Sequence, residues 1–106
     1  MEEVIVAKFL VTYHGGSGMP TDPAQAEQIK AAFGKWLASA GKAVTDPGAP
    51  LRPATQVSNG MAMPQVALGG YSVIEATDVD EATEILRTHP FVARGGTLQV
   101  DEVVAI

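Results

Sequence analysis

The chain opens with an apolar stretch whose side chains suit a β-strand. Residues 4–13 are rich in β-branched and aromatic residues and end at a His-Gly-Gly sequence. Successive side chains of a strand point to opposite faces, which places Val6 and Leu10 on one face. Phe9 and Val11 then lie on the other face. This pattern predicts a strand that is covered on both sides.

An amphipathic helix is predicted after the glycine-rich loop that follows. Asp22 can cap its N-terminus, and Pro23 suits its first position. Gln25 lies where a capping box has Glu or Gln, and Gly41 suits a left-handed C-terminal stop. Apolar residues recur between these ends at steps of three and four, which gives one apolar stripe. The stripe consists of Ala26, Ile29, Phe33, Trp36, Leu37 and Ala40.

The middle of the chain predicts two strands joined by an irregular segment. Extended chain is expected at residues 43–45, a turn at 46–50 and a continuation of the strand at 54–58. Residues 71–76 predict the third strand, which is again apolar on both faces.

A second helix has a start signal of its own. Asp78 is placed to cap it, and Glu81 follows at the position that closes a capping box. Pro90 disfavours helical geometry in the residue before it, so the helix is expected to end near Thr88. A Gly-Gly pair then leads into a last strand at residues 97–106.

The expected order is strand, helix, strand, strand, helix, strand in one domain, residues 1–106. Right-handed crossovers place both helices on one face of a four-stranded antiparallel sheet, which is the ferredoxin-like α+β fold. The other face is also expected to be apolar and to need a cover. A second copy of the sheet is the economical cover, so we predict a homodimer with its sheets face to face. The alternative is a monomer whose long loops fold under the sheet.

Composition excludes several classes of function. The chain of 106 residues, 46% hydrophobic and 18% charged, suffices for one domain with its own core. The absence of cysteine excludes disulfides and cysteine nucleophiles and fits a reducing compartment. The net charge is −5 and basic residues are scattered, so nucleic-acid binding is not expected. The acidic start and the short first apolar stretch predict a cytoplasmic protein without membrane contact.

Several segments of the chain occur together in a known family. They are residues 69–76, 80–82, 89–92 and 95–100, with residues 36–37 and 44–48 in the first half. Their combination resembles the YCII-related family and its DGPF relatives. The resemblance implies a dimeric α+β barrel. In that family a histidine and an aspartate form a suspected acid–base dyad, and the resemblance aligns them with Gln25 and His89. Both residues differ here, so the chemistry of the dyad is not carried over.

The expected topology brings five polar side chains to one rim of the sheet. They come from the ends of the first strand and second helix, the starts of the first helix and third strand, and the loop before the last strand. Convergent polar groups over an apolar cleft are typical of a small-molecule site. We predict His89 and His14 as catalytic candidates and Arg94, Tyr71 and Gln25 as ligand-binding candidates.

Most candidates also have a structural interpretation. His89 can act as a general acid or base, or it can cap the C-terminal end of the second helix. Arg94 can hold a carboxylate or phosphate, or it can be a solvated loop charge. His14 can be an exposed turn residue, and Tyr71 can serve packing at the rim. Asp46 is expected to bond the backbone of its own turn.

No metal or cofactor is predicted. Two histidines without ligand spacing do not make a metal site, and the glycines at residues 15–18 lack the Lys-Ser/Thr of a phosphate-binding loop. Three hypotheses for the function stay open, and the first is the one we favour. It is the binding of a small organic molecule in a cleft beside the dimer sheet, without chemistry. The others are a cofactor-free acid–base enzyme that uses His89, and a dimerisation module without a ligand.

Overall fold

The computed structural model of the protein describes residues 6–15 and 22–106. The start of the predicted first strand and most of the glycine-rich loop lie outside these residues. The elements in chain order are β1 (Ala7–His14), α1 (Pro23–Ala40), the short 3₁₀ helix η1 (Gly41–Ala43), β2 (Val44–Pro50), β3 (Gly70–Ala76), α2 (Val79–Arg87), α3 (Pro90–Ala93) and β4 (Thr97–Glu102).

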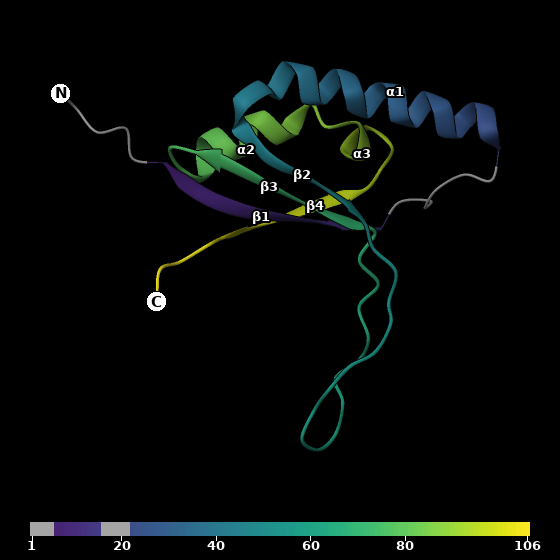
Figure 1. Ribbon diagram of the computed structural model, residues 1–106, viewed down its shortest axis with the longest axis vertical. Helices are drawn as coiled ribbons and strands as arrows, with labels where there is room; N and C mark the ends of the chain where they lie inside the picture. The colour runs from purple at the N-terminus through teal and green to yellow at the C-terminus, as the bar shows by residue number, and fades with distance from the viewer. Residues whose placement is uncertain (1–5, 16–21) are drawn as a thin grey trace.

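The four strands form one antiparallel sheet in the order β2-β3-β1-β4. The helices lie together on one face of this sheet (Figure 1). The predicted α+β class, the four-stranded antiparallel sheet and the one-sided helix layer are therefore confirmed, and the arrangement is compatible with the ferredoxin-like fold. The four-residue helix α3 is an addition that the sequence pattern did not predict.

Both long helices begin at the predicted caps. The Asp22 carboxylate accepts a hydrogen bond from the backbone N–H of Ala24 at 2.9 Å, and Asp78 accepts one from Glu81 N–H at 2.8 Å. The side chain of Glu81 bonds the backbone N–H of Thr77 at 3.3 Å, one residue before the position that a capping box would give it. Local cap chemistry therefore fixes where each helix starts.

The core lies between the sheet and the helix layer. It contains the residues of β1 and β3 that share one face and the apolar stripes of α1 and α2. The indole N–H of Trp36 donates to the carbonyl oxygen of Ile85 at 3.1 Å, which ties α1 to α2. The buried cluster consists of Phe9, Val11, Trp36, Ile74, Ala76, Ala82 and Leu86.

The predicted second strand is wrong in its internal details. The turn expected at residues 46–50 lies inside β2, where the register against β3 shifts on both sides of Asp46. The Asp46 side chain still bonds the backbone N–H of Gly48, at 2.8 Å, so the local turn chemistry is retained as a bulge. Residues 54–58 form no strand, and the last strand ends at Glu102.

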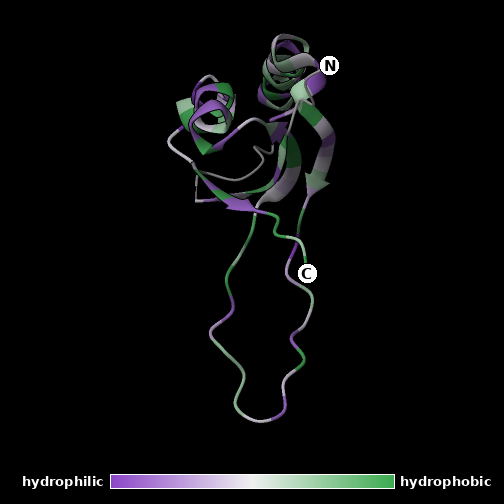
Figure 2. Cartoon of the chain, turned by 90° about the vertical axis from the view of Figure 1, so that its left-hand side faces the viewer, coloured by the Kyte–Doolittle hydropathy of each residue, from purple (hydrophilic) through white to green (hydrophobic). Residues whose placement is uncertain are grey.

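A long segment projects from the sheet between β2 and β3. This segment, residues 51–69, is called the arm below; it contains no helix or strand. It extends away from the body on the side opposite to the helices, as two perpendicular views show (Figures 1 and 2). The backbone N–H of Leu51 donates to the carbonyl oxygen of Gly69 at 3.1 Å, which closes its root.

The sheet face opposite to the helices carries apolar side chains without a cover from the described residues. Val6 and Leu10 of the first strand region are 47% and 36% exposed. Leu10 is the direct partner of Val73 in the pairing of β1 with β3. This face is called the open face below.

None of the helices in the described part of the chain is long and apolar enough to cross a bilayer.

Candidate functional site

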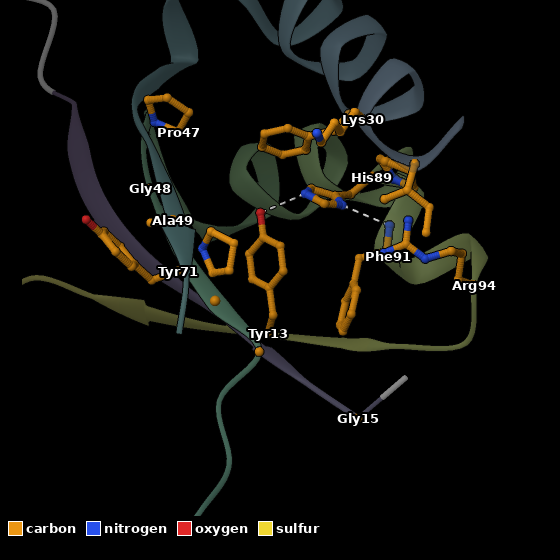
Figure 3. Close-up of a pocket in the computed structure, with 16 residues that line it drawn as sticks. Tyr13, Gly15, Lys30, Pro47, Gly48, Ala49, Tyr71, His89, Phe91 and Arg94 are labelled. Carbon is orange, nitrogen blue, oxygen red and sulfur yellow. Dashed lines mark hydrogen bonds between the residues drawn. The ribbon is translucent and has the colours of Figure 1, made fainter. Parts of the chain in front are cut away.

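A cavity of about 290 Å³ lies between the sheet and the helix layer, at the end of the sheet where the arm begins. Its lining comes from the last residues of β1, one side of α1, the bulged part of β2, the root of the arm, and the segment from His89 to Arg94. Figure 3 shows how these side chains converge. The cavity joins segments that are far apart in the sequence.

A continuous chain of hydrogen bonds crosses the inner wall of this cavity. The backbone N–H of Phe91 donates to Nδ1 of His89 at 3.0 Å. Nε2 of His89 lies 2.8 Å from the hydroxyl oxygen of Tyr13, which lies 2.8 Å from Oγ of Ser72. The Ser72 hydroxyl lies 2.8 Å from the carbonyl oxygen of Pro47 in the β2 bulge. These bonds are called the hydrogen-bond chain below.

The donors and acceptors of the hydrogen-bond chain allow the bonds to be donated in one direction only. A backbone N–H can only donate, so Nδ1 of His89 is an acceptor and the ring proton of the neutral imidazole is on Nε2. That proton is donated to Tyr13, and the Tyr13 hydroxyl donates to Ser72. Ser72 in turn donates to Pro47, whose carbonyl can only accept. Each member therefore uses its donor, and no buried side-chain polar atom of the described residues lacks a partner.

His89 is deeply packed. The residue is 2% exposed, and its ring centroid lies 4.4 Å from that of Trp36 and 5.1 Å from that of Tyr13. Burial, assisted by the positive charge of Arg94, lowers the pKa of His89 to about 4. Burial also raises the pKa of Tyr13, partly offset by its bond to Ser72. Both rings are uncharged at neutral pH.

The position of His89 in the chain corrects the structural interpretation given above. One of the two interpretations of His89 was a cap for the C-terminal end of α2, where a positive imidazole would be favoured. His89 instead caps the N-terminus of α3, with Pro90 at the first helical position. An N-cap side chain must accept a hydrogen bond, so this role requires the neutral ring.

The outer part of the cavity is positively charged. Lys30 from α1 and Arg94 line it, and no acidic residue of the described chain does. The Arg94 guanidinium lies 5.6 Å from the centroid of the Phe91 ring. Lys30 has a loose contact with Glu27, at 3.9 Å, on the exposed surface of α1. The interior is apolar, because Tyr13, Phe33 and Phe91 contribute their rings.

The structure brings only part of the predicted rim together. His89 and Arg94 line the cavity. Tyr71 also belongs to the lining, but Figure 3 shows its ring pointing away from the cavity. Gln25 is exposed and is not part of the lining. His14 follows Tyr13 in β1 and so lies on the open face, where Nε2 is 2.8 Å from Oγ1 of Thr12. The predicted convergence is therefore wrong for His14 and Gln25, which lie outside the lining, whereas Tyr71 belongs to the lining with its ring turned away.

Two members of the hydrogen-bond chain were missed at the sequence level. Tyr13 shares its strand face with Phe9 and Val11, and Ser72 shares its face with Ile74. A polar group on an otherwise apolar, helix-covered face has to find a partner inside the protein. That periodicity was the available signal, but in β1 it does not reveal which of the two apolar faces the helices cover.

No family model, curated protein or solved structure matches the chain. In the described residues, no group of three or more His, Asp or Glu side chains is placed to hold a metal ion.

Proposed function

We propose that the protein binds a small organic anion with an apolar body, such as an aromatic or aliphatic carboxylate, in this cavity. One observation carries the proposal: two cationic side chains, Lys30 and Arg94, stand over an aromatic interior without an acidic residue in the described lining. The whole chain has a net charge of −5, so this local excess of positive charge runs against its average. A ligand whose carboxylate lies at Lys30 and Arg94 and whose apolar group lies inside would match both the charged outer part and the apolar interior of the cavity.

The interior supports an apolar body for the ligand. Its polar side chains, Tyr13 and His89, already use their donors in the hydrogen-bond chain. A ligand group that needed an acceptor or donor deep in the cavity would therefore remain poorly paired, which costs free energy. The rings of Phe33 and Phe91 instead offer apolar contact area.

Arg94 is the better placed of the two cations for recognition. Its contact with the Phe91 ring restrains the guanidinium beside the cavity, and the planar group can bind a carboxylate through two parallel hydrogen bonds. Lys30 adds a second positive charge from α1. Its weak contact with Glu27 can be exchanged for a ligand carboxylate at little cost, because both side chains are exposed.

The bonding of His89 favours binding over the alternative of acid–base catalysis. A general base needs a free lone pair, and the lone pair on Nδ1 is used by Phe91. A general acid needs a proton to give, and the proton on Nε2 is shared with Tyr13. The lowered pKa of His89 also keeps the doubly protonated ring rare at neutral pH. Catalysis by His89 would require this arrangement to rearrange first.

We further propose that the protein is a YCII-related homodimer with sheets packed through the open face. The resemblance of residues 69–76 and 89–92 to that family supports the assignment. The pairing of Leu10 with Val73 gives the open face an apolar centre. Lys8 and Glu75 lie opposite each other beside it, so the same face holds both signs of charge. Such a surface can pair with its own copy about a two-fold axis.

Calorimetric titration with phenylacetate and with its neutral isostere phenylacetamide tests the ligand proposal. We expect phenylacetate to bind more tightly, and Arg94→Gln to weaken its binding by at least about tenfold, since a charge-assisted hydrogen bond contributes about 1.5–3 kcal/mol when well formed. Lys30→Gln should have a smaller effect. Lys35→Gln, an exposed lysine of α1 outside the lining, is the matched control and should leave binding unchanged. Equal binding of acid and amide, or equal effects of Arg94→Gln and Lys35→Gln, would exclude an anion site.

A further inference from the structure

The arm and the open face lie on the same side of the molecule. We infer that the arm, residues 51–69, clasps the second copy of the chain whose sheet covers the open face. This inference rests on the proposed homodimer and adds the element that holds it together. The arm runs past the sheet on the side without helices, into the space that a second copy would occupy (Figures 1 and 2).

The composition of the arm is that of an interface rather than of a solvated loop. Arg52 is its only charged residue, and it carries several large apolar side chains. Met61 and Met63 are 96% and 79% exposed, and Val57 is almost fully exposed as well. Interface cores are enriched in Met and depleted in Lys, Glu and Asp. The single subunit leaves these side chains in water.

The arm depends little on its own subunit. Among the described residues, its backbone bonds to the body only at its root, where the Gly69 N–H donates to the carbonyl oxygen of Tyr13 at 2.7 Å. Its two legs do not pair as a hairpin. Their extended backbone groups are therefore available to another chain. Pro53 and Pro64 limit the conformations of the legs, which lowers the entropy cost of docking.

A second copy is the occupant that fits both surfaces. In an isologous pair each subunit offers one open face and one arm, so the two-fold axis places each arm beside the partner. One association then covers Leu10 and Val73 in the sheets and the apolar residues of both arms. A different protein would have to match the open face and the arm separately, whereas every copy of this chain carries both surfaces.

The clasp also concerns the ligand site. Pro50, the last residue of β2 before the arm, and Gly69, the last residue of the arm, both line the cavity. An arm held by the partner would keep this wall of the cavity in place. Docking of the arm and the shape of the ligand site are therefore linked in each subunit.

The exposed methionines allow a clean test by sedimentation velocity over a range of concentrations. Met61 and Met63 contribute little to a lone subunit, so Met61→Ser with Met63→Ser should leave the circular dichroism spectrum unchanged. We expect this double variant to raise the dissociation constant of the dimer by at least about tenfold, given the apolar burial it removes. Val79→Ser, an exposed valine in the helix layer, is the control and should not change it.

A cross-linking experiment locates the arm directly. The chain has no cysteine, so Met61→Cys gives one site for a benzophenone label. In mixed ¹⁴N- and ¹⁵N-labelled protein, we expect cross-links that join light and heavy chains. Cross-links confined to one chain, with an unchanged dissociation constant for the methionine variant, would overturn the clasp and leave the face-to-face dimer standing. A monomeric wild-type protein would overturn the clasp and the dimer together. Phenylacetate binding is measured separately, so neither result decides the ligand proposal.

Discussion

The buried neutral state of His89 predicts a specific loss of stability in acid. Its ordinary pKa of about 6.5 applies to the unfolded chain, and the pKa in the folded protein is about 4. The unfolded chain therefore binds a proton first as the pH falls. The contribution of His89 to folding is complete above pH 6.5 and is lost between about pH 6.5 and pH 4.

The size of this loss follows from the difference in pKa. One unit corresponds to about 1.4 kcal/mol, so the full effect is about 3 kcal/mol. At pH 4.5 the unfolded chain is almost fully protonated at this position and the folded protein only partly. We therefore expect about 2–3 kcal/mol of the free energy of unfolding to be lost between pH 7 and pH 4.5 through His89. Protonation of carboxylates adds a separate loss, which a variant must subtract.

His89→Asn is the informative variant. Asparagine is a good N-cap and can accept the bond from Phe91, but it does not titrate in this range. Urea unfolding can be followed through Trp36, the only tryptophan, at fixed protein concentration because association also affects stability. We expect the variant to be less stable at pH 7 and to lose about 2–3 kcal/mol less than the wild type by pH 4.5.

His14→Asn is the matched control, because His14 lies on the open face outside the core cluster. This variant removes the other histidine and leaves the buried ring of His89 in place, so the loss ascribed to His89 should remain. The reasoning fails if His89→Asn and the wild type lose the same free energy of unfolding between pH 7 and pH 4.5, within about 0.5 kcal/mol. It also fails if His14→Asn, and not His89→Asn, flattens the curve.

Two further substitutions test the inner wall of the cavity by urea unfolding. Tyr13→Phe should lower the free energy of unfolding by about 1–3 kcal/mol, because the buried Nε2–H of His89 loses its acceptor. Tyr71→Phe on the other face is the control and should be nearly neutral. Equal losses in the two variants would contradict the hydrogen-bond chain. Gly48→Ala should cost about 2–4 kcal/mol, because Gly48 has φ of 75° and a Cβ would overlap the carbonyl oxygen of Tyr71. Gly34→Ala in the open surface of α1 should instead stabilise by about 0.5–1 kcal/mol, and a loss at both glycines would contradict the packing described.

The sequence predicted the elements whose signals are local and long. The cap at Asp22 and the apolar stripe define α1, and the cap at Asp78 defines the start of α2. The prediction failed at β2. The Asp-Pro-Gly segment makes the expected side-chain bond of a turn, but it lies inside the strand instead of ending it. Pairing with β3 continues on both sides of Asp46, so the turn is absorbed as a bulge. The local sequence alone could not reveal that pairing with β3 outweighs the turn preference.

The site was harder to predict, because it depends on which strand face is covered. β1 is apolar on both faces, so its pattern does not say whether Tyr13 or His14 points toward the helices. The prediction placed residues by the ends of their elements and therefore grouped both faces on one rim. The role of His89 was missed for another reason: α3 is four residues long, too short for a periodic signal.

The hydrogen-bond chain and the root of the arm meet in the same piece of backbone. Ser72 bonds the carbonyl of Pro47, the Gly48 backbone packs against Tyr71, and the strand continues to Pro50, where the arm leaves the sheet. One side of the cavity is therefore fixed by a buried chain whose donors are all in use. The other side is held at the root of the arm, where Gly69 N–H donates to the carbonyl oxygen of Tyr13 and Leu51 N–H to that of Gly69. A ligand that fills the cavity touches both sides, so its affinity should depend on the arm more than on titration of His89 near neutral pH.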